Sequence, residues 1–304
     1  MKTKAQKRIR DIKRNWVCYL MFIPVALFFI IFSYIPMYWI GTAFFDFVPR
    51  LGYSGSEFVG FKWFSDFFVK RDGWHLIWNT LKLNIWDVLI SFCTPIILAL
   101  LFFELSLKRL RNVIQTVTYL PHFISIVIIC GMIVQFTKSD GLFSNIGYSL
   151  FRIPKHNILD ETKNYIPIYI ISQIWKEVGF ASVIYYAALC SIDPSQFEAA
   201  RIDGANRFQI MFRVTIPSIL PTIVTMLILR MGSMLTVGFE KASLLQTGLN
   251  LPISEVLSTH VYNVGLVRQN YGYGTAVGLM NSVVNLVFLL ITNRVAKRVG
   301  MNLF

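Results

Sequence analysis

Five ionisable side chains lie well inside apolar stretches of the sequence, where a charge needs a physical explanation. They are Lys82, Asp87, Lys176, Glu177 and Arg230. A lysine, arginine or aspartate at the centre of a lipid-exposed helix costs about 2.5–3.5 kcal/mol, so we expect these groups to face protein or water. One arrangement pairs them between helices, for example Asp87 with Lys176, and Glu177 would pair with Arg230 in the same way. In the other, several of them line a water-filled path, and the two arrangements are compatible because ion pairs can border such a path.

Residue types that serve enzymes are present, but not in catalytic or metal-binding spacing. The four histidines show no H-E-x-x-H spacing, and no G-x-S-x-G or G-x-x-x-x-G-K-[ST] segment occurs. The chain therefore lacks a P-loop for nucleotide phosphates, and we expect no catalysis, no metal site and no cofactor. His122, which follows Pro121, is interpreted as structural. The four cysteines lack C-x-x-C spacing and are interpreted as small core residues.

The composition shows which kind of protein positions these charges. Of 304 residues, 55% are hydrophobic and only 15% are charged, where a soluble domain carries about 25% charged residues. The mean hydropathy is +0.56. These values exclude a disordered chain, a small disulfide scaffold and an ordinary soluble enzyme. The class that remains is an all-α polytopic membrane protein.

Six apolar runs are long enough to cross a bilayer, which takes about 20 residues. The runs are 17–45, 76–103, 117–137, 166–190, 217–239 and 274–293. We therefore predict six transmembrane helices in one membrane domain, residues 17–304, which follows a basic tail at residues 1–16. The first run is too long for the core of a signal peptide, so we expect it to stay as a membrane span.

The distribution of lysine and arginine predicts the orientation. Sixteen of them lie in the N-terminal tail, the links 104–116 and 191–216, and the C-terminus, whereas the three longer links together hold ten. Because lysine and arginine concentrate on the cytoplasmic side, we expect both termini to be cytoplasmic. The net charge of +13 is then an orientation signal, and we expect no nucleic-acid binding.

The cytoplasmic link 191–216 has the pattern of a short helix, a turn and a second helix. Asp193 suits an N-cap, Pro194 the first helical position, and Gln196 the matching position of a capping box. We expect a helix at 194–202, a turn at Asp203-Gly204, and a second helix at 205–214. This link is either a solvated surface connection or a docking element for a cytoplasmic partner, which small side chains would allow to approach closely.

The same link carries a specific family pattern. It reads Glu198-Ala199-Ala200, then Asp203-Gly204-Ala205, then Phe212, Ile216-Pro217 and Pro221. This resembles the EAA loop of permease subunits of binding-protein-dependent ATP-binding cassette (ABC) importers. The resemblance extends to the polysaccharide and oligosaccharide branch of that family through RNWVCYLMFIP, YIPMY, NTLKLN, QTVTYLPHFIS, VGFE and YGYGTAVGLMNSVVN.

The resemblance implies the fold of a type I importer permease and a role for each residue of the motif. Glu198 would meet a basic residue of a separate ATP-binding subunit, which holds ATP and Mg²⁺. Ala199, Ala200 and Gly204 would allow close seating, and Asp203 and Ala205 would shape the turn. The implied partners are ATP-binding subunits, a second and different permease subunit, and an extracellular solute-binding protein. The implied location is the plasma membrane of a prokaryote, crossed several times.

The resemblance also makes a carbohydrate the expected cargo. Gln173 and Trp175 then become candidate cargo contacts, since the C–H face of a sugar stacks on an aromatic ring, although a tryptophan in a span more often packs against other side chains. Three cations against two anions in the spans favour an acidic saccharide weakly. The alternatives are an ABC importer for another polar solute and an ion-driven secondary transporter. A secondary transporter needs no EAA loop and often has internal repeats, of which the halves show none.

Overall fold

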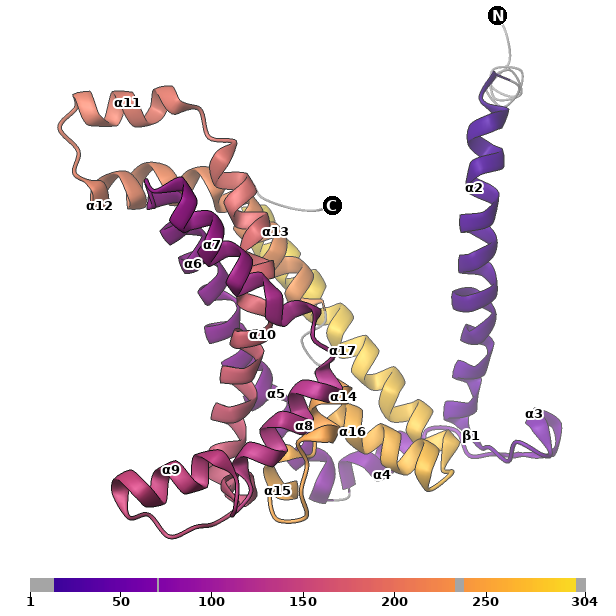
Figure 1. Cartoon of the computed structure of the whole chain (residues 1–304). Helices are drawn as coiled ribbons and strands as arrows, with labels where there is room; N and C mark the ends of the chain where they lie inside the picture. The colour runs from indigo at the N-terminus through magenta and orange to yellow at the C-terminus, as the bar shows by residue number, and fades with distance from the viewer. Residues whose placement is uncertain (1–13, 70, 233–237, 299–304) are drawn as a thin grey trace, which may run out of the picture.

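The computed structural model describes residues 14–69, 71–232 and 238–298 and shows a mostly helical chain. This confirms the predicted all-α class. Most of the predicted basic tail lies outside the described residues. Figure 1 shows long helices running between two ends of the molecule. The start of α2 (Trp16–Phe29), the end of α17 (Tyr271–Arg298) and α11 (Pro194–Ile202) lie at the same end, as the predicted orientation requires.

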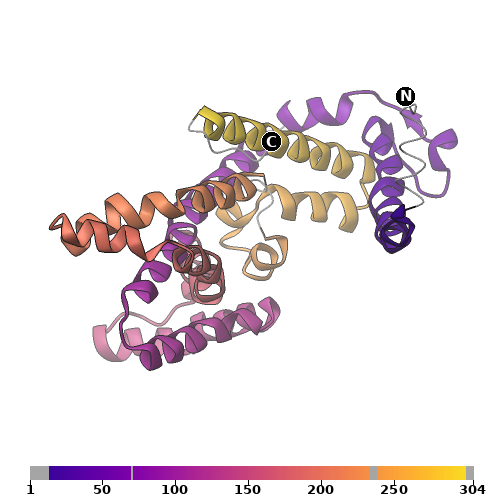
Figure 2. The same cartoon turned by 90° about the horizontal axis from the view of Figure 1, so that it is seen from above.

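The N-terminal span stands apart from the other helices (Figures 1 and 2). It consists of α2, a π-helical turn η1 (Ile30–Tyr34) and a 3₁₀ stretch η2 (Ile35–Phe44). No residue of α2 is buried. The end of η2 joins the body, where Thr42 Oγ1 donates a hydrogen bond of 3.0 Å to Thr275 Oγ1 of α17.

Short elements at the opposite end from α11 connect this span to the next. They are β1 (Phe45–Asp46), α3 (Gly52–Gly55), β2 (Glu57–Phe58) and α4 (Lys62–Val69). The two strands pair antiparallel, with Phe45 opposite Phe58. Trp63 and Phe67 of α4 pack with Leu257 and Tyr273 in a buried cluster, which fixes α4 against α17 and the segment before it.

The second span bends at a wide turn. It runs through α5 (Arg71–Trp86), the π-helical turn η3 (Asp87–Ser91) and α6 (Cys93–Glu104). Pro95 has no N–H to donate to the carbonyl of Ser91, four residues earlier. Instead, Thr94 Oγ1 lies 3.5 Å from that carbonyl oxygen. The proline thus accounts for the interruption of the helical ladder at this point.

The predicted third run, 117–137, is divided between two helices. The segment contains α7 (Lys108–Tyr119), η4 (Leu120–Phe123), α8 (Ile126–Thr137), α9 (Leu142–Phe151) and η5 (Ile158–Asp160). The break falls at Pro121, and Ser125 starts a new helix by accepting a hydrogen bond of 3.3 Å from Val127 N. Figure 1 shows α9 lying across the direction of the spans.

Helix α10 (Thr162–Cys190) is the central element of the body. One buried cluster joins it to α6 and α13 through Ala99, Leu189 and Ile219. Helix α10 has 29 residues, enough to cross a membrane. It is nevertheless absent from the five described helices that satisfy both length and hydropathy, because Gln173, Lys176 and Glu177 make it more polar. Six spans therefore remain a prediction.

The rest of the chain forms the protruding helix pair, the fifth span and the C-terminal helices. The elements are α11, α12 (Arg207–Ile210), η6 (Met211–Thr215), α13 (Ile216–Met231), α14 (Phe239–Leu244), α15 (Leu251–Ser254), α16 (Leu257–Val261), η7 (Tyr262–Val267) and α17. The predicted fifth run ends at 239, whereas α13 ends at Met231 and α14 begins at Phe239. Residues 233–237 lie outside the described part of the chain.

Candidate functional site

A polar cavity of about 890 Å³ lies where the second span, η4, α10, α13 and α14 meet. Five of the seven residues predicted to border a solute path lie on its wall: Asp87, Gln173, Lys176, Glu177 and Arg230. Lys82 and Trp175 are not on the wall of this cavity. Trp175 precedes Lys176 on α10, so its side chain points about 100° away around the helix, and it is 47% exposed.

Helix interruptions at two prolines shape this wall. Asp87 begins the wide turn before Pro95, and His122 follows Pro121 in the break between α7 and α8. Wide π-helical turns are frequent at functional sites, and non-helical backbone at membrane depth is tolerated where it lines a cavity. The two prolines therefore help to position the site, because each helix interruption presents a titratable side chain to the cavity.

Asp87 forms an ion pair with Arg230, which lies near the end of α13. The Asp87 side chain is 8% exposed and that of Arg230 is 43% exposed. Asp87 Oδ1 is buried and has no hydrogen-bond partner among the described residues. The pair joins two different spans, as one predicted arrangement requires, but the partners differ from the example in which Asp87 pairs with Lys176.

A second group of charges lies on α10 and the break before α8. Lys176 Nζ is 2.7 Å from Glu177 Oε1, and Glu177 Oε2 is 2.8 Å from His122 Nδ1. Lys176 Nζ also donates to the carbonyl oxygen of His122 at 3.1 Å. The His122 ring stacks on Phe180, with centroids 3.9 Å apart. His122 is thus packed, as the sequence interpretation held, but it also lines the cavity, which that interpretation missed.

Lys241 of α14 is the cavity residue that sequence reasoning did not single out. Its side chain is 2% exposed. Its ammonium donates to the carbonyl of Tyr169 at 2.7 Å and to Gln173 Oε1 at 3.0 Å, and it lies 4.3 Å from the centre of the Tyr169 ring. Among the described residues it makes no ion pair with a carboxylate within 4.0 Å. The available signal was a lysine directly after Glu240, at the end of the fifth apolar run.

A smaller cavity of about 460 Å³ adjoins the first one. The two share Gln173, Glu177 and Arg230 on their walls. Ser91 and Tyr185 line only the smaller cavity. The shared residues make the two cavities neighbouring compartments along α10. Ion pairs form, as one predicted arrangement requires, and they border open space, while a water-filled solute path stays a prediction.

The link 191–216 forms the protruding pair α11 and α12. Asp193 Oδ1 accepts a hydrogen bond of 2.9 Å from Ser195 N, which starts α11 and holds the pKa of Asp193 below its usual value. The structure has no capping box at Gln196; one forms instead between Asn206 and Gln209. Gly204 has φ +78°, which suits glycine in the turn.

The surface of this pair is open to a partner. No residue of α11 is buried, and Glu198, Ala199, Asp203 and Gly204 are exposed, while Ala200 and Ala205 are half-buried. Three large apolar side chains lie beside them: Ile202, Phe208 and Phe212 are 86%, 71% and 63% exposed. Sequence reasoning named Phe212 within the family pattern but missed Ile202 and Phe208. Such apolar exposure beside small residues is typical of an interaction surface.

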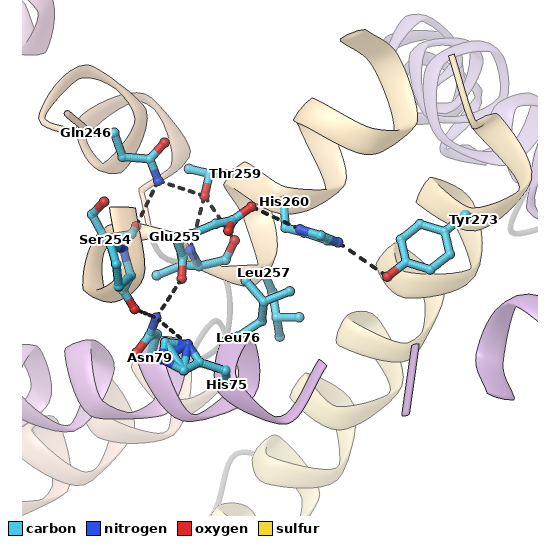
Figure 3. Close-up of polar contacts among 12 residues, drawn as sticks. His75, Leu76, Asn79, Gln246, Ser254, Glu255, Leu257, Thr259, His260 and Tyr273 are labelled. Atoms are coloured by element: carbon cyan, nitrogen blue, oxygen red, sulfur yellow. Dashed lines mark hydrogen bonds and ion pairs between the residues drawn. The ribbon is translucent and has the colours of Figure 1, made fainter. Parts of the chain in front are cut away.

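A third polar group lies at the opposite end from α11, near α15 and α16 (Figure 3). His260 Nδ1 is 3.0 Å from Glu255 Oε1, and His260 Nε2 is 3.3 Å from the Tyr273 hydroxyl. Asn79 of α5 donates to the carbonyls of Pro252 and Glu255 at 2.8 and 3.2 Å. These contacts tie the segment after α14 to α5 and α17, and we interpret them as structural.

Comparison with known proteins shows strong similarity along the chain. The profile of a family described as "Binding-protein-dependent transport system inner membrane component" matches residues 91–301. Protein LplB of Bacillus subtilis is 40% identical over 94% of this chain and 90% of its own length. The "Polygalacturonan/rhamnogalacturonan transport system permease protein YteP" of the same organism is 37% identical over 98% of this chain and 93% of its own.

Solved structures also resemble the chain in fold. A chain in the crystal structure of a bacterial ABC transporter involved in the import of the acidic polysaccharide alginate superposes with a TM-score of 0.89 at 39% identity, covering 96% of this chain and 99% of that one. A second structure, in which that transporter is in complex with an alginate pentasaccharide-bound periplasmic protein, gives a TM-score of 0.88 at 39% identity, covering 96% and 98%.

Proposed function

The chain belongs to the family of binding-protein-dependent transport system inner membrane components, and we propose that it is the permease of an ABC importer that carries acidic oligosaccharides. The observation that carries the proposal is the polar cavity of about 890 Å³ between the spans. A hydrophilic solute needs such a polar interior to pass the apolar part of a bilayer. The carbohydrate importer class follows from the relatives, whereas the acidic cargo is inferred from the cavity.

The cations of the cavity wall support an acidic cargo. Arg230 and Lys176 pair with Asp87 and Glu177, but the buried ammonium of Lys241 has only neutral partners among the described residues. A buried lysine with only neutral partners is stabilised in its charged form when an anionic ligand lies beside it. A sugar carboxylate supplies that charge, and the similar solved transporter imports an acidic polysaccharide.

We infer that α11 couples this permease to a separate ATP-binding subunit, which binds ATP with Mg²⁺. The support is local: α11 protrudes, the motif runs from Glu198 in α11 to Ala205 in the turn after it, and the nearby side chains of Ile202 and Phe208 are exposed. Closure of the ATP-binding subunits would move α11, and rigid-body motion would reach the spans through η6 and α13. The chain contributes no phosphate-binding loop of its own.

A second permease subunit would complete the cavity and cover the first span. Helix α2 has no buried residue and stands away from the body (Figure 1). In a complex, this helix would pack against spans of a different permease. On the opposite end from α11, the segments around α9 and α15 would meet a solute-binding protein, and the similar solved transporter is in complex with a periplasmic protein. The location that follows is a bacterial plasma membrane.

The first test is the ATPase activity of the reconstituted complex with its own binding protein. It is measured across neutral and acidic oligosaccharides of matched length. Stimulation by the acidic class supports the proposal. Stimulation by neutral sugars alone would contradict the acidic cargo, and stimulation by no sugar would contradict the carbohydrate assignment in favour of another polar solute.

A further inference from the structure

The ion pair of Asp87 and Arg230 lies at the boundary between the two cavities. Arg230 lines both, whereas Asp87 lines only the larger and Ser91 only the smaller. Asp87 and Ser91 are the first and last residues of the same wide turn η3. A solute that moves from the larger to the smaller cavity therefore passes beside Arg230, which is paired with Asp87.

The pair is asymmetric, because the Arg230 side chain is much more exposed to open space than that of Asp87. Asp87 is 8% exposed, and one of its carboxylate oxygens is buried without a partner among the residues that the structure describes. Arg230 is 43% exposed and reaches the walls of both cavities. Removing the cation from a buried carboxylate is strongly unfavourable. The pair is therefore expected to stay closed unless another group compensates for the separation.

We propose that this pair is a gate between the two compartments, opened when a carboxylate of the cargo replaces Asp87 on the guanidinium of Arg230. The inference rests on the proposed function, and it adds the residues that would select the cargo. A guanidinium has five N–H donors in a planar fork. It can accept a second carboxylate before releasing the first, so an anionic sugar lowers the barrier. A neutral sugar offers only hydroxyl groups, which form weaker hydrogen bonds to a cation.

The Ser91 hydroxyl can supply the hydrogen bond that the Asp87 carboxylate needs after Arg230 leaves. Its hydroxyl is buried and makes no hydrogen bond among the described residues. It lies four residues after Asp87, and residues with that spacing are neighbours on a helix. A small rotation in the turn would let Ser91 donate to the Asp87 carboxylate. The turn has room to adjust, because Pro95 supplies no N–H to the carbonyl of Ser91, whose contact with Thr94 Oγ1 is long at 3.5 Å.

The experiment compares uptake of an oligouronate with uptake of the same oligosaccharide after its carboxyl groups have been reduced to alcohols. Both are offered to the complete transporter in proteoliposomes, at concentrations that saturate its binding protein. We expect Arg230→Gln to reduce acidic uptake at least tenfold and to remove the preference for the acidic sugar. Asp87→Asn removes the negative charge that holds Arg230, so it should raise neutral uptake several-fold. The acidic-to-neutral ratio should then come close to one.

Two further variants separate a gate from a structural ion pair. Ser91→Ala should slow acidic uptake a few-fold while neutral uptake is unchanged. Lys82→Gln removes a charge from the same span but away from the wall of the cavity, and it should leave the ratio as in the unaltered protein. ATPase stimulation by the loaded binding protein checks that each variant is folded and assembled.

The outcomes distinguish this inference from the function on which it rests. An unchanged acidic-to-neutral ratio in Arg230→Gln and Asp87→Asn, with ATPase stimulation intact, would overturn the gate and leave the importer in place. Equal loss of both sugars in these two variants, again with intact ATPase stimulation, would also overturn it, because the pair would then not select. Failure of the unaltered complex to take up either sugar would overturn the cargo assignment and the gate together.

Discussion

Gly179 of α10 lies directly against the backbone of Thr118 in α7, so closely that a Cβ on Gly179 would overlap the Thr118 carbonyl. The contact brings the break at Pro121, and therefore His122, against the polar part of α10. Small residues allow helix backbones to approach in membranes. We therefore expect Gly179→Ala to destabilise the protein by about 1–3 kcal/mol through overpacking, measured as a lower midpoint of thermal unfolding in detergent.

Gly131 of α8 provides the matched control for this substitution. It is also a glycine within a helix, but a Cβ added there meets nothing within 4 Å. Gly131→Ala should leave the unfolding midpoint unchanged or raise it slightly, because alanine favours helix more than glycine does. Equal midpoints for Gly179→Ala and Gly131→Ala would show that α7 and α10 do not pack as described.

Glu198→Lys in α11 should abolish transport and leave membrane insertion intact. The side chain is exposed, so its reversal costs the isolated chain little, whereas at an interface the new charge would oppose the basic partner that the family pattern implies. The measurement is cargo uptake together with the amount of protein in the membrane. Glu57→Lys, a matched exchange at an exposed site of β2, should transport normally. Normal uptake by Glu198→Lys would refute the coupling role of α11.

Gly204 offers an independent test of the same surface. Its φ of +78° is strained for any residue with a side chain, although no neighbouring atom would block a Cβ. We expect Gly204→Val to abolish uptake by distorting the turn after α11, and Gly204→Asn to retain more of it, because asparagine tolerates this backbone conformation better. Uptake by the valine variant that equals that of the unaltered protein would show that the turn geometry does not matter for coupling.

The local parts of this protein could be predicted from sequence, and α11 shows why. The predicted helix, 194–202, has the observed bounds Pro194–Ile202, because an N-cap, a proline and a glycine turn act within a few residues of each other. The break at Pro121 was not predicted, because the run 117–137 was interpreted as one span, although a proline within a helix is a local signal for an interruption. The pairing of Asp87 with Arg230 could not be predicted in this way. These two residues are far apart in sequence and meet only through the packing of α13 beside the second span.

The cavity residue Lys241 shows a second reason why part of the site could not be predicted from sequence. Its position after the fifth apolar run predicts an external link, but α14 folds back so that its ammonium reaches Gln173 of α10. Nothing in the spacing of residues 238–244 specifies this return. Conversely, Trp175 and Lys82 fit the pattern of a solute path by type and depth, and only their rotation around the helix places them elsewhere.

Asn250 should be among the residues most sensitive to truncation in the segments opposite α11. It is fully buried, and its amide donates to the carbonyls of Leu159 and Leu245 at 3.0 Å each, joining two links that are distant in sequence. Asn250→Ala leaves both carbonyls buried without this donor, which costs about 1–3 kcal/mol for each group. Thermal unfolding checks this prediction. The control is Asn145→Ala, because Asn145 is exposed and its amide donates to the carbonyl of Asp140 alone among the described residues. An equal effect of Asn145→Ala would contradict it.

The contact between Glu255 and His260 predicts an acid-dependent loss of stability (Figure 3). The hydrogen bond from His260 holds the pKa of Glu255 below its usual value, against the effect of burial, and the positive charges of His260, Arg268 and His75 act in the same direction as the bond. A lowered pKa in the folded state means that the stabilisation is fully present above the unfolded pKa of about 4.3. It is lost as the pH falls through the folded value.

Glu255→Gln isolates this effect, because the amide cannot titrate but keeps the size of the side chain. The unaltered protein should lose more thermal stability than Glu255→Gln between pH 6 and pH 3, so that the difference between their unfolding midpoints shrinks as the pH falls. The exposed Glu57→Gln controls for the general effect of removing a carboxylate. A midpoint difference between the protein and Glu255→Gln that stays constant over this range would show that the Glu255 carboxylate is not selectively stabilised in the folded state, and that the contact with His260 adds no stability through its charge.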